Sequence, residues 1–174
     1  MALTSQAPWP SRRLTRDEMR AALVEQVSNR ACWRCGKYLG SMLYFDFGGK
    51  VEIPSMRQGV ISQGEAILGV RDCYWSLLSK NQLVIDSDSI SDDNAIENLR
   101  CLQGTFLCDF LVPEPGHVNF VFSGGVVLSL DTTNRYATRD NIAEYVAPDG
   151  RIYTITPQGH FYLSDEVSKI RFTQ

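Results

Sequence analysis

No apolar run in this sequence approaches the roughly 20 residues that a helix needs to cross a bilayer. Residues 1–10 lack the basic segment followed by an apolar stretch that a secretory signal requires. The five cysteines are irregularly spaced, as in chains that keep free thiols in a reducing compartment. We therefore expect a cytoplasmic protein with no membrane partner.

Recognisable catalytic signatures are also missing. There is no Gly-x-Ser-x-Gly elbow, and the glycine pairs at 48–49 and 124–125 lack the Lys-Ser/Thr end of a phosphate loop. The only histidines, His117 and His160, could divide acid and base roles, but each lies beside an expected turn at the start of a strand. We expect no catalytic residue and no cofactor. A small hydrolase or nuclease using His117 or His160 is one alternative function.

Metal ligands are few and poorly spaced. Cys32-Trp-Arg-Cys35 has a spacing at which two thiolates can hold one zinc ion or form a redox pair. No second paired motif supplies the other zinc ligands, and no expected strand precedes the motif as in thioredoxins. We interpret Cys32 and Cys35 as ordinary thiols at the end of a helix and expect no metal site.

The charge is small but unevenly distributed. The formal net charge is -3, of which residues 1–37 carry +4 and the remainder carries -7. A basic first segment could bind nucleic acid, yet its arginines are scattered through a helical pattern instead of forming a compact run. We interpret them as a solvated helix face and expect no nucleic-acid partner.

The first part of the chain predicts one helix. Residues 1–13 contain two prolines and little apolar periodicity, which indicates a flexible lead-in. Thr15 followed by Glu18 matches a capping box. Apolar residues then recur every fourth position, at Met19, Leu23 and Val27. We predict a helix over about 15–30 at the start of a single β-rich domain covering 14–174.

Alternating apolar residues dominate the rest of the sequence. Within 42–48, Leu43, Phe45 and Phe47 alternate with polar residues, and Gly48-Gly49 predicts a tight turn towards Val51. Further strands are predicted over 66–70, 74–78, 82–85, 104–112, 117–122, 126–130, 142–146, 151–155 and 161–163. The expected class is α+β, with a mainly antiparallel, strongly curved or barrel-like sheet and an N-terminal helix.

The densest acidic cluster lies in a polar stretch between strands. It consists of Asp86, Asp88, Asp92, Asp93 and Glu97. Its spacing differs from that of a calcium-binding EF-hand, and no glycine occupies the sixth loop position. Two interpretations stay open: a solvated loop, or a partner-binding surface for a basic protein. These five residues are our candidate binding site.

The order of these blocks resembles a group of small bacterial immunity-like proteins that accompany polymorphic toxins. The blocks are Tyr44-Phe-Asp-Phe-Gly48, 66–70 leading to Tyr74-Trp-Ser-Leu77, the Asp86 region, 102–104, 120–130, and Glu144-Tyr-Val146 before Pro148-Asp-Gly150. Together they cover about residues 37–155. The family pattern has Trp-Arg where this chain has Trp75-Ser76, and Trp where it has Tyr145.

The resemblance implies a β-rich antitoxin-like fold and a function in direct binding. We expect an immunity protein that neutralises a cognate toxin, encoded next to it, by occluding the active site or substrate surface of the toxin. A non-catalytic adaptor or secretion accessory protein is a further alternative. It would bind a partner without protecting a cell from toxicity.

Overall fold

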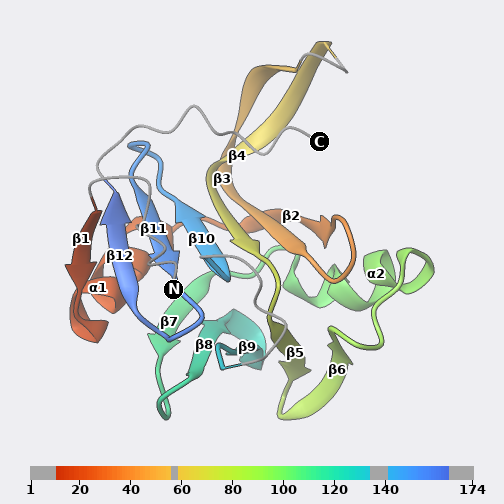
Figure 1. The fold of residues 1–174 in the computed structure, drawn as a ribbon. Helices are drawn as coiled ribbons and strands as arrows, with labels where there is room; N and C mark the ends of the chain where they lie inside the picture. Colours follow the sequence, from red (N-terminus) through yellow and green to blue (C-terminus); the bar gives the residue numbers. More distant parts are fainter. Residues whose placement is uncertain (1–10, 56–58, 134–140, 165–174) are drawn as a thin grey trace, which may run out of the picture.

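The computed structural model describes residues 11–55, 59–133 and 141–164, which form two antiparallel β-sheets and two α-helices (Figure 1). The expected β-rich, antiparallel character is confirmed. The barrel-like alternative is wrong, because the strands belong to two separate open sheets instead of one closed sheet.

The larger sheet has seven strands. Their order across the sheet is β1 (Ser11–Leu14), β12 (Phe161–Ser164), β11 (Ile152–Ile155), β10 (Ala143–Val146), β4 (Gly59–Val70), β3 (Leu43–Ser55) and β2 (Cys32–Lys37). The smaller sheet has five strands, in the order β6 (Gln82–Asp86), β5 (Tyr74–Ser79), β9 (Val126–Asp131), β8 (His117–Phe122) and β7 (Leu107–Leu111). All nine strands predicted after residue 60 are present. β4 begins seven residues before its predicted start, and the other ends differ by at most three residues.

The first helix, α1 (Arg16–Val27), has the capping box that the sequence predicts. Thr15 Oγ1 accepts from the Glu18 amide at 3.2 Å, and a Glu18 carboxylate oxygen accepts from the Thr15 amide at 2.7 Å. The expectation that this helix is the first element is wrong, as is the lead-in assigned to 11–13. These residues pair with β12 as strand β1, and residues 1–10 lie outside the described residues.

The second helix, α2 (Asp92–Leu99), continues into a short 3-10 helix, η1 (Arg100–Leu102). Residues 134–140, between β9 and β10, lie outside the described residues.

The turn predicted at Gly48-Gly49 is wrong, because β3 continues through both glycines. Phe47 pairs with Ala66 and Lys50 with Gly64, so β3 has one more residue than β4 between these pairs. This β-bulge uses the positive φ of +75° at Gly48, a conformation that glycine adopts without a steric penalty. The same glycine property that predicted a turn therefore bends a continuous strand.

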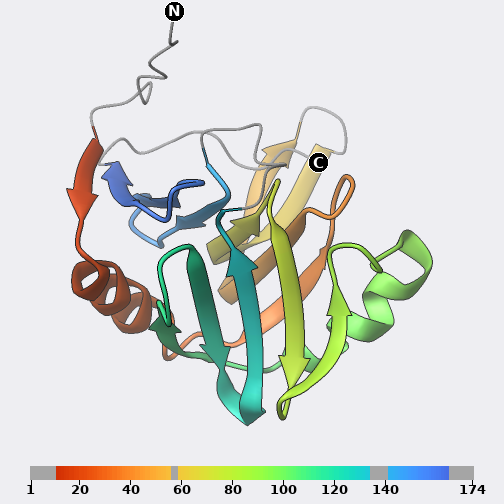
Figure 2. The same cartoon turned by 60° about the horizontal axis from the view of Figure 1, so that its bottom comes forward.

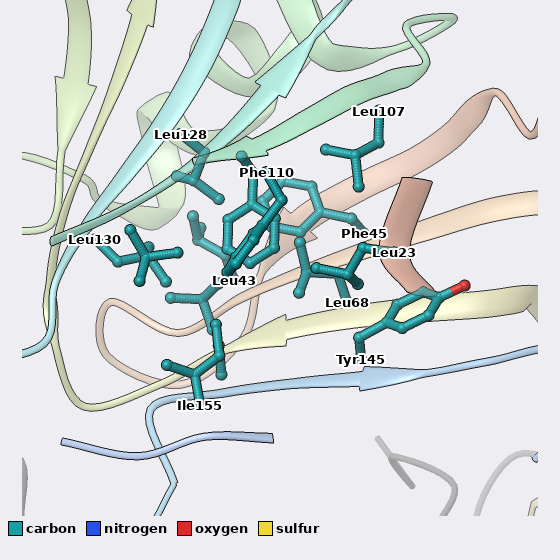
Figure 3. Packing of buried hydrophobic residues seen from close by; sticks show 14 of the residues in the cluster. Leu23, Leu43, Phe45, Leu68, Leu107, Phe110, Leu128, Leu130, Tyr145 and Ile155 are labelled. Atoms are coloured by element: carbon teal, nitrogen blue, oxygen red, sulfur yellow. The ribbon is translucent and has the colours of Figure 1, made fainter. Parts of the chain in front are cut away.

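The core lies between the two sheets. The side chains of Leu43, Phe45 and Phe47 point from β3 towards the smaller sheet, where the Phe122 ring lies 6.4 Å from that of Phe45 and 6.3 Å from that of Phe47. Residues from α1, β4, β7 and β10 join the same cluster, including Leu23, Leu68, Phe110 and Tyr145 (Figure 3). Helix α1 lies beside β7 and covers this end of the sandwich (Figure 2).

Replacement of Phe45 tests this core directly. Phe45 has no exposed surface, so Phe45→Ala leaves a cavity and should lower the free energy of unfolding by about 3–5 kcal/mol. Val60→Ala, at a position that is 63% exposed on β4, should change it by less than about 0.5 kcal/mol. Urea unfolding of both variants measures the difference. A loss below about 1 kcal/mol for Phe45→Ala would contradict the packing described here.

Candidate functional site

Most of the acidic residues predicted as a binding site lie on or next to α2. Ala95 and Leu99 bury one side of this helix, and Asp93, Ile96 and Glu97 are exposed on the other side. Ile96 is 75% exposed, the highest value among the large apolar residues that the structure describes as exposed. The helix therefore exposes one large apolar side chain together with two acidic residues.

Asp86 has a different role from its acidic neighbours. Its Oδ1 accepts from the amides of Ser89 at 2.9 Å and Asp88 at 3.2 Å and from the Ser89 hydroxyl, and its Oδ2 accepts from the Tyr74 hydroxyl at 3.2 Å. These hydrogen bonds lower the pKa of Asp86, and the one donated by the Ser89 hydroxyl has the largest effect. We assign Asp86 to the shape of the loop between β6 and α2.

Asp92 joins α2 to the larger sheet. Its carboxylate forms an ion pair with Lys37 Nζ, and the Lys37 side chain is only 12% exposed. The turn between β2 and β3 follows Lys37, and it lies next to α2 in both views (Figures 1 and 2). This turn contains a second exposed apolar residue, Leu39, which is 67% exposed.

We call this region the α2 surface and define it by Leu39, Asp88, Asp93, Ile96 and Glu97. Within the described part of the chain, its three carboxylates have no ion-pair partner. The sequence located the acidic residues but missed Ile96 and Leu39. Ile96 and Leu99 are three residues apart, a spacing typical of one shared face, so the pattern of α2 alone does not predict that Ile96 is exposed.

The two histidines occupy different surroundings. His117 Nδ1 lies 3.3 Å from a Glu114 carboxylate oxygen at the start of β8. His160 lies in the turn before β12 and lines an open groove with Arg13, Thr15 and Arg16. His117 is not among the described residues that line this groove. The glycines that precede the two histidines lie close together, since a Cβ added at Gly159 would be 3.9 Å from the Gly116 amide nitrogen.

Cys32 and Cys35 lie on β2, which corrects their expected position at the end of a helix. A register shift lies between Cys32 and Arg34. The interaction between the two thiols lowers the pKa of Cys35 and, together with burial, raises that of Cys32. The Cys35 thiol donates to the Leu99 carbonyl at 3.2 Å and so connects β2 to α2. Among the described residues, no group of three or more potential ligands could hold a metal ion.

A cavity of about 80 Å³ lies on the face of the larger sheet opposite the core. Tyr44 and Asp46 line it, because they alternate along β3 with the core residues Leu43, Phe45 and Phe47. Asp46 is only 1% exposed, and its carboxylate accepts from Arg34 Nε at 2.6 Å and from the Gly64 amide at 2.7 Å. The sequence offered one signal here, since aspartate is uncommon within an apolar strand.

Comparison of this chain with protein-family models, curated proteins and solved structures finds no match. Among the described residues, no helix is long and apolar enough to cross a membrane.

The hydrogen bonds of Asp86 give a pH-dependent prediction. Because folding lowers this pKa, the stabilisation is present above the unfolded carboxyl value of about 3.9 and is lost as pH falls through the folded value. Asp86→Asn should therefore lower stability at neutral pH, and the difference from wild type should shrink as the pH falls below about 4.

Urea unfolding at several pH values measures this difference. The matched control is Asp88→Asn, because the exposed Asp88 carboxylate has no hydrogen-bond partner among the described residues. This control should stay within about 0.5 kcal/mol of wild type at neutral pH. If Asp86→Asn lowers the free energy of unfolding by the same amount at all pH values, the charge of Asp86 does not stabilise the loop.

Proposed function

We propose that this chain is an immunity protein that binds a cognate antibacterial toxin through the α2 surface and occludes the active site or substrate surface of the toxin. The single observation that carries the binding surface is Ile96, which is 75% exposed on the same helix as the exposed residues Asp93 and Glu97. The resemblance of residues 37–155 to immunity-like proteins supports the choice of a toxin as partner.

The α2 surface has the chemistry of a protein interface. An exposed isoleucine contributes about 1.5–3 kcal/mol when a partner buries it completely. Charged groups around an apolar centre contribute mainly to orientation and association rate. Because Asp88, Asp93 and Glu97 are all acidic, the complementary surface of the toxin is basic.

The sandwich supports this use of α2. The helix is fixed by burial of Ala95 and Leu99, by the Lys37–Asp92 ion pair and by the bond from Cys35 to Leu99. A binding face held on a packed framework loses little conformational entropy when the partner docks. The α2 surface therefore suits tight occlusion of a rigid toxin.

Truncation of Ile96 tests the surface in a cell. Coexpression with the product of the neighbouring toxin gene should restore growth with the wild-type chain, and Ile96→Ala should weaken both rescue and binding. A central apolar contact is expected to lose at least about 1 kcal/mol on truncation, or roughly fivefold in Kd. Calorimetry with the catalytically inactive toxin measures the Kd.

Val60→Ala is the matched control, because Val60 is a similarly exposed apolar residue on β4. It should leave rescue and Kd unchanged. Absence of both a complex and growth rescue for the wild-type chain would refute the immunity function. A complex without rescue would favour an adaptor or secretion accessory protein.

Salt dependence tests the role of the carboxylates. The association rate constant of the complex should fall several-fold between about 0.05 M and 0.5 M salt, because ions screen the attraction between exposed charges. The double variant Asp93→Asn/Glu97→Gln should associate more slowly at low salt, and its association rate constant should depend less on the salt concentration. Stopped-flow fluorescence measures the rate constant.

The control for this experiment removes the same charge elsewhere. Glu25 and Glu52 are exposed on α1 and β3, so Glu25→Gln/Glu52→Gln changes the net charge equally without altering the α2 surface. If both double variants slow association to the same extent, net charge alone and not the α2 surface directs the encounter.

A further inference from the structure

The cavity on the outer face of the larger sheet contains an arginine held in a fixed position. The Arg34 guanidinium carbon lies 5.1 Å from the ring centre of Trp33 and 5.5 Å from that of Tyr44. Its Nε donates to Asp46 at 2.6 Å. Contacts with two aromatic rings and one carboxylate restrict the orientation of this planar group.

Asp46 is itself fixed, so it positions Arg34. The second oxygen of its carboxylate accepts from the Gly64 amide in the neighbouring strand, and the side chain is almost completely buried. The arginine is consequently held against the sheet, with its side chain 31% exposed. A guanidinium that is ordered before binding loses little entropy when a ligand forms hydrogen bonds to it.

The terminal nitrogens of Arg34 remain available for a ligand. Among the described residues, Arg34 has a hydrogen-bond partner only at Nε, which leaves four N–H donors on the two terminal nitrogens. Parallel N–H donors of this type match the two oxygens of a carboxylate. The arginine can therefore hold Asp46 on one side and an anionic group on the other.

The remaining lining selects the kind of anion. Met42 and Ile67 supply apolar surface, and Tyr38 and Tyr44 supply phenol groups. Arg71, which forms an ion pair with Glu144, also lines the cavity. A volume of about 80 Å³ accommodates a carboxylate with a short aliphatic body. Inorganic phosphate is a poorer fit, because it would lose hydration against the apolar wall formed by Met42 and Ile67.

We propose that this cavity binds a small organic carboxylate with a short aliphatic body, through the terminal nitrogens of Arg34. Asp46 is the positioning residue, and Met42 and Ile67 contact the aliphatic part. The site goes beyond the proposed immunity function and does not depend on it. It adds a ligand site on the outer face of the sheet.

NMR titration of the full chain tests the site with propionate, isobutyrate and isovalerate. Each carboxylate should cause saturable shifts of the amide signals around Arg34, Tyr44 and Gly64. Isobutyramide has the shape of isobutyrate without its charge, and should cause no saturable shift at these residues. Inorganic phosphate should bind at least tenfold more weakly than isobutyrate.

Two variants separate binding from folding. Arg34→Lys keeps a positive charge for Asp46 but removes the forked donors, and Arg34→Gln/Asp46→Asn removes both charges together. Each should weaken isobutyrate binding at least tenfold with the amide spectrum otherwise retained. Arg100→Gln, at an exposed arginine of η1, should leave binding unchanged.

Several outcomes would overturn the proposal. They are the absence of saturable shifts for all three carboxylates, equal binding of isobutyramide, tighter binding of phosphate, and unchanged binding in Arg34→Lys. If the double variant unfolds, Arg34→Lys alone decides the result.

Discussion

The alternation of side chains along β3 is the constraint on which the rest of the structure depends. Leu43, Phe45 and Phe47 point to one face and are buried between the two sheets. Tyr44 and Asp46 point to the opposite face, where they line the cavity with Arg34. Because successive residues of a strand face opposite sides, the packing of the core fixes the composition of the outer face.

The bulge at Gly48 extends this constraint beyond the core. Its extra residue changes the pairing of β3 with β4, and Gly64 follows at the position opposite Lys50. The Gly64 amide then donates to the buried Asp46 carboxylate, which in turn holds Arg34. A backbone irregularity in one strand therefore contributes to the order of a charged pair on the sheet.

The two proposed sites use the framework differently. The α2 surface is exposed, and its carboxylates face solvent without ion-pair partners among the described residues. The cavity is small, and its central charge is paired and partly buried. Exposed charges act mainly on encounter with a large partner, whereas ordered donors next to apolar surface suit a small ligand.

The sequence by itself determined the local elements. Its alternation located β3 to β12 but not β1 and β2, and Thr15 with Glu18 located the start of α1, because both signals depend on near neighbours. Only the tertiary structure decided that the strands form two sheets, that Gly48 makes a bulge, and that Asp46 meets Arg34 and Gly64. These contacts join residues that are distant in the chain. The alternation along a strand does not show which strand it pairs with, because the alternation is the same for every partner.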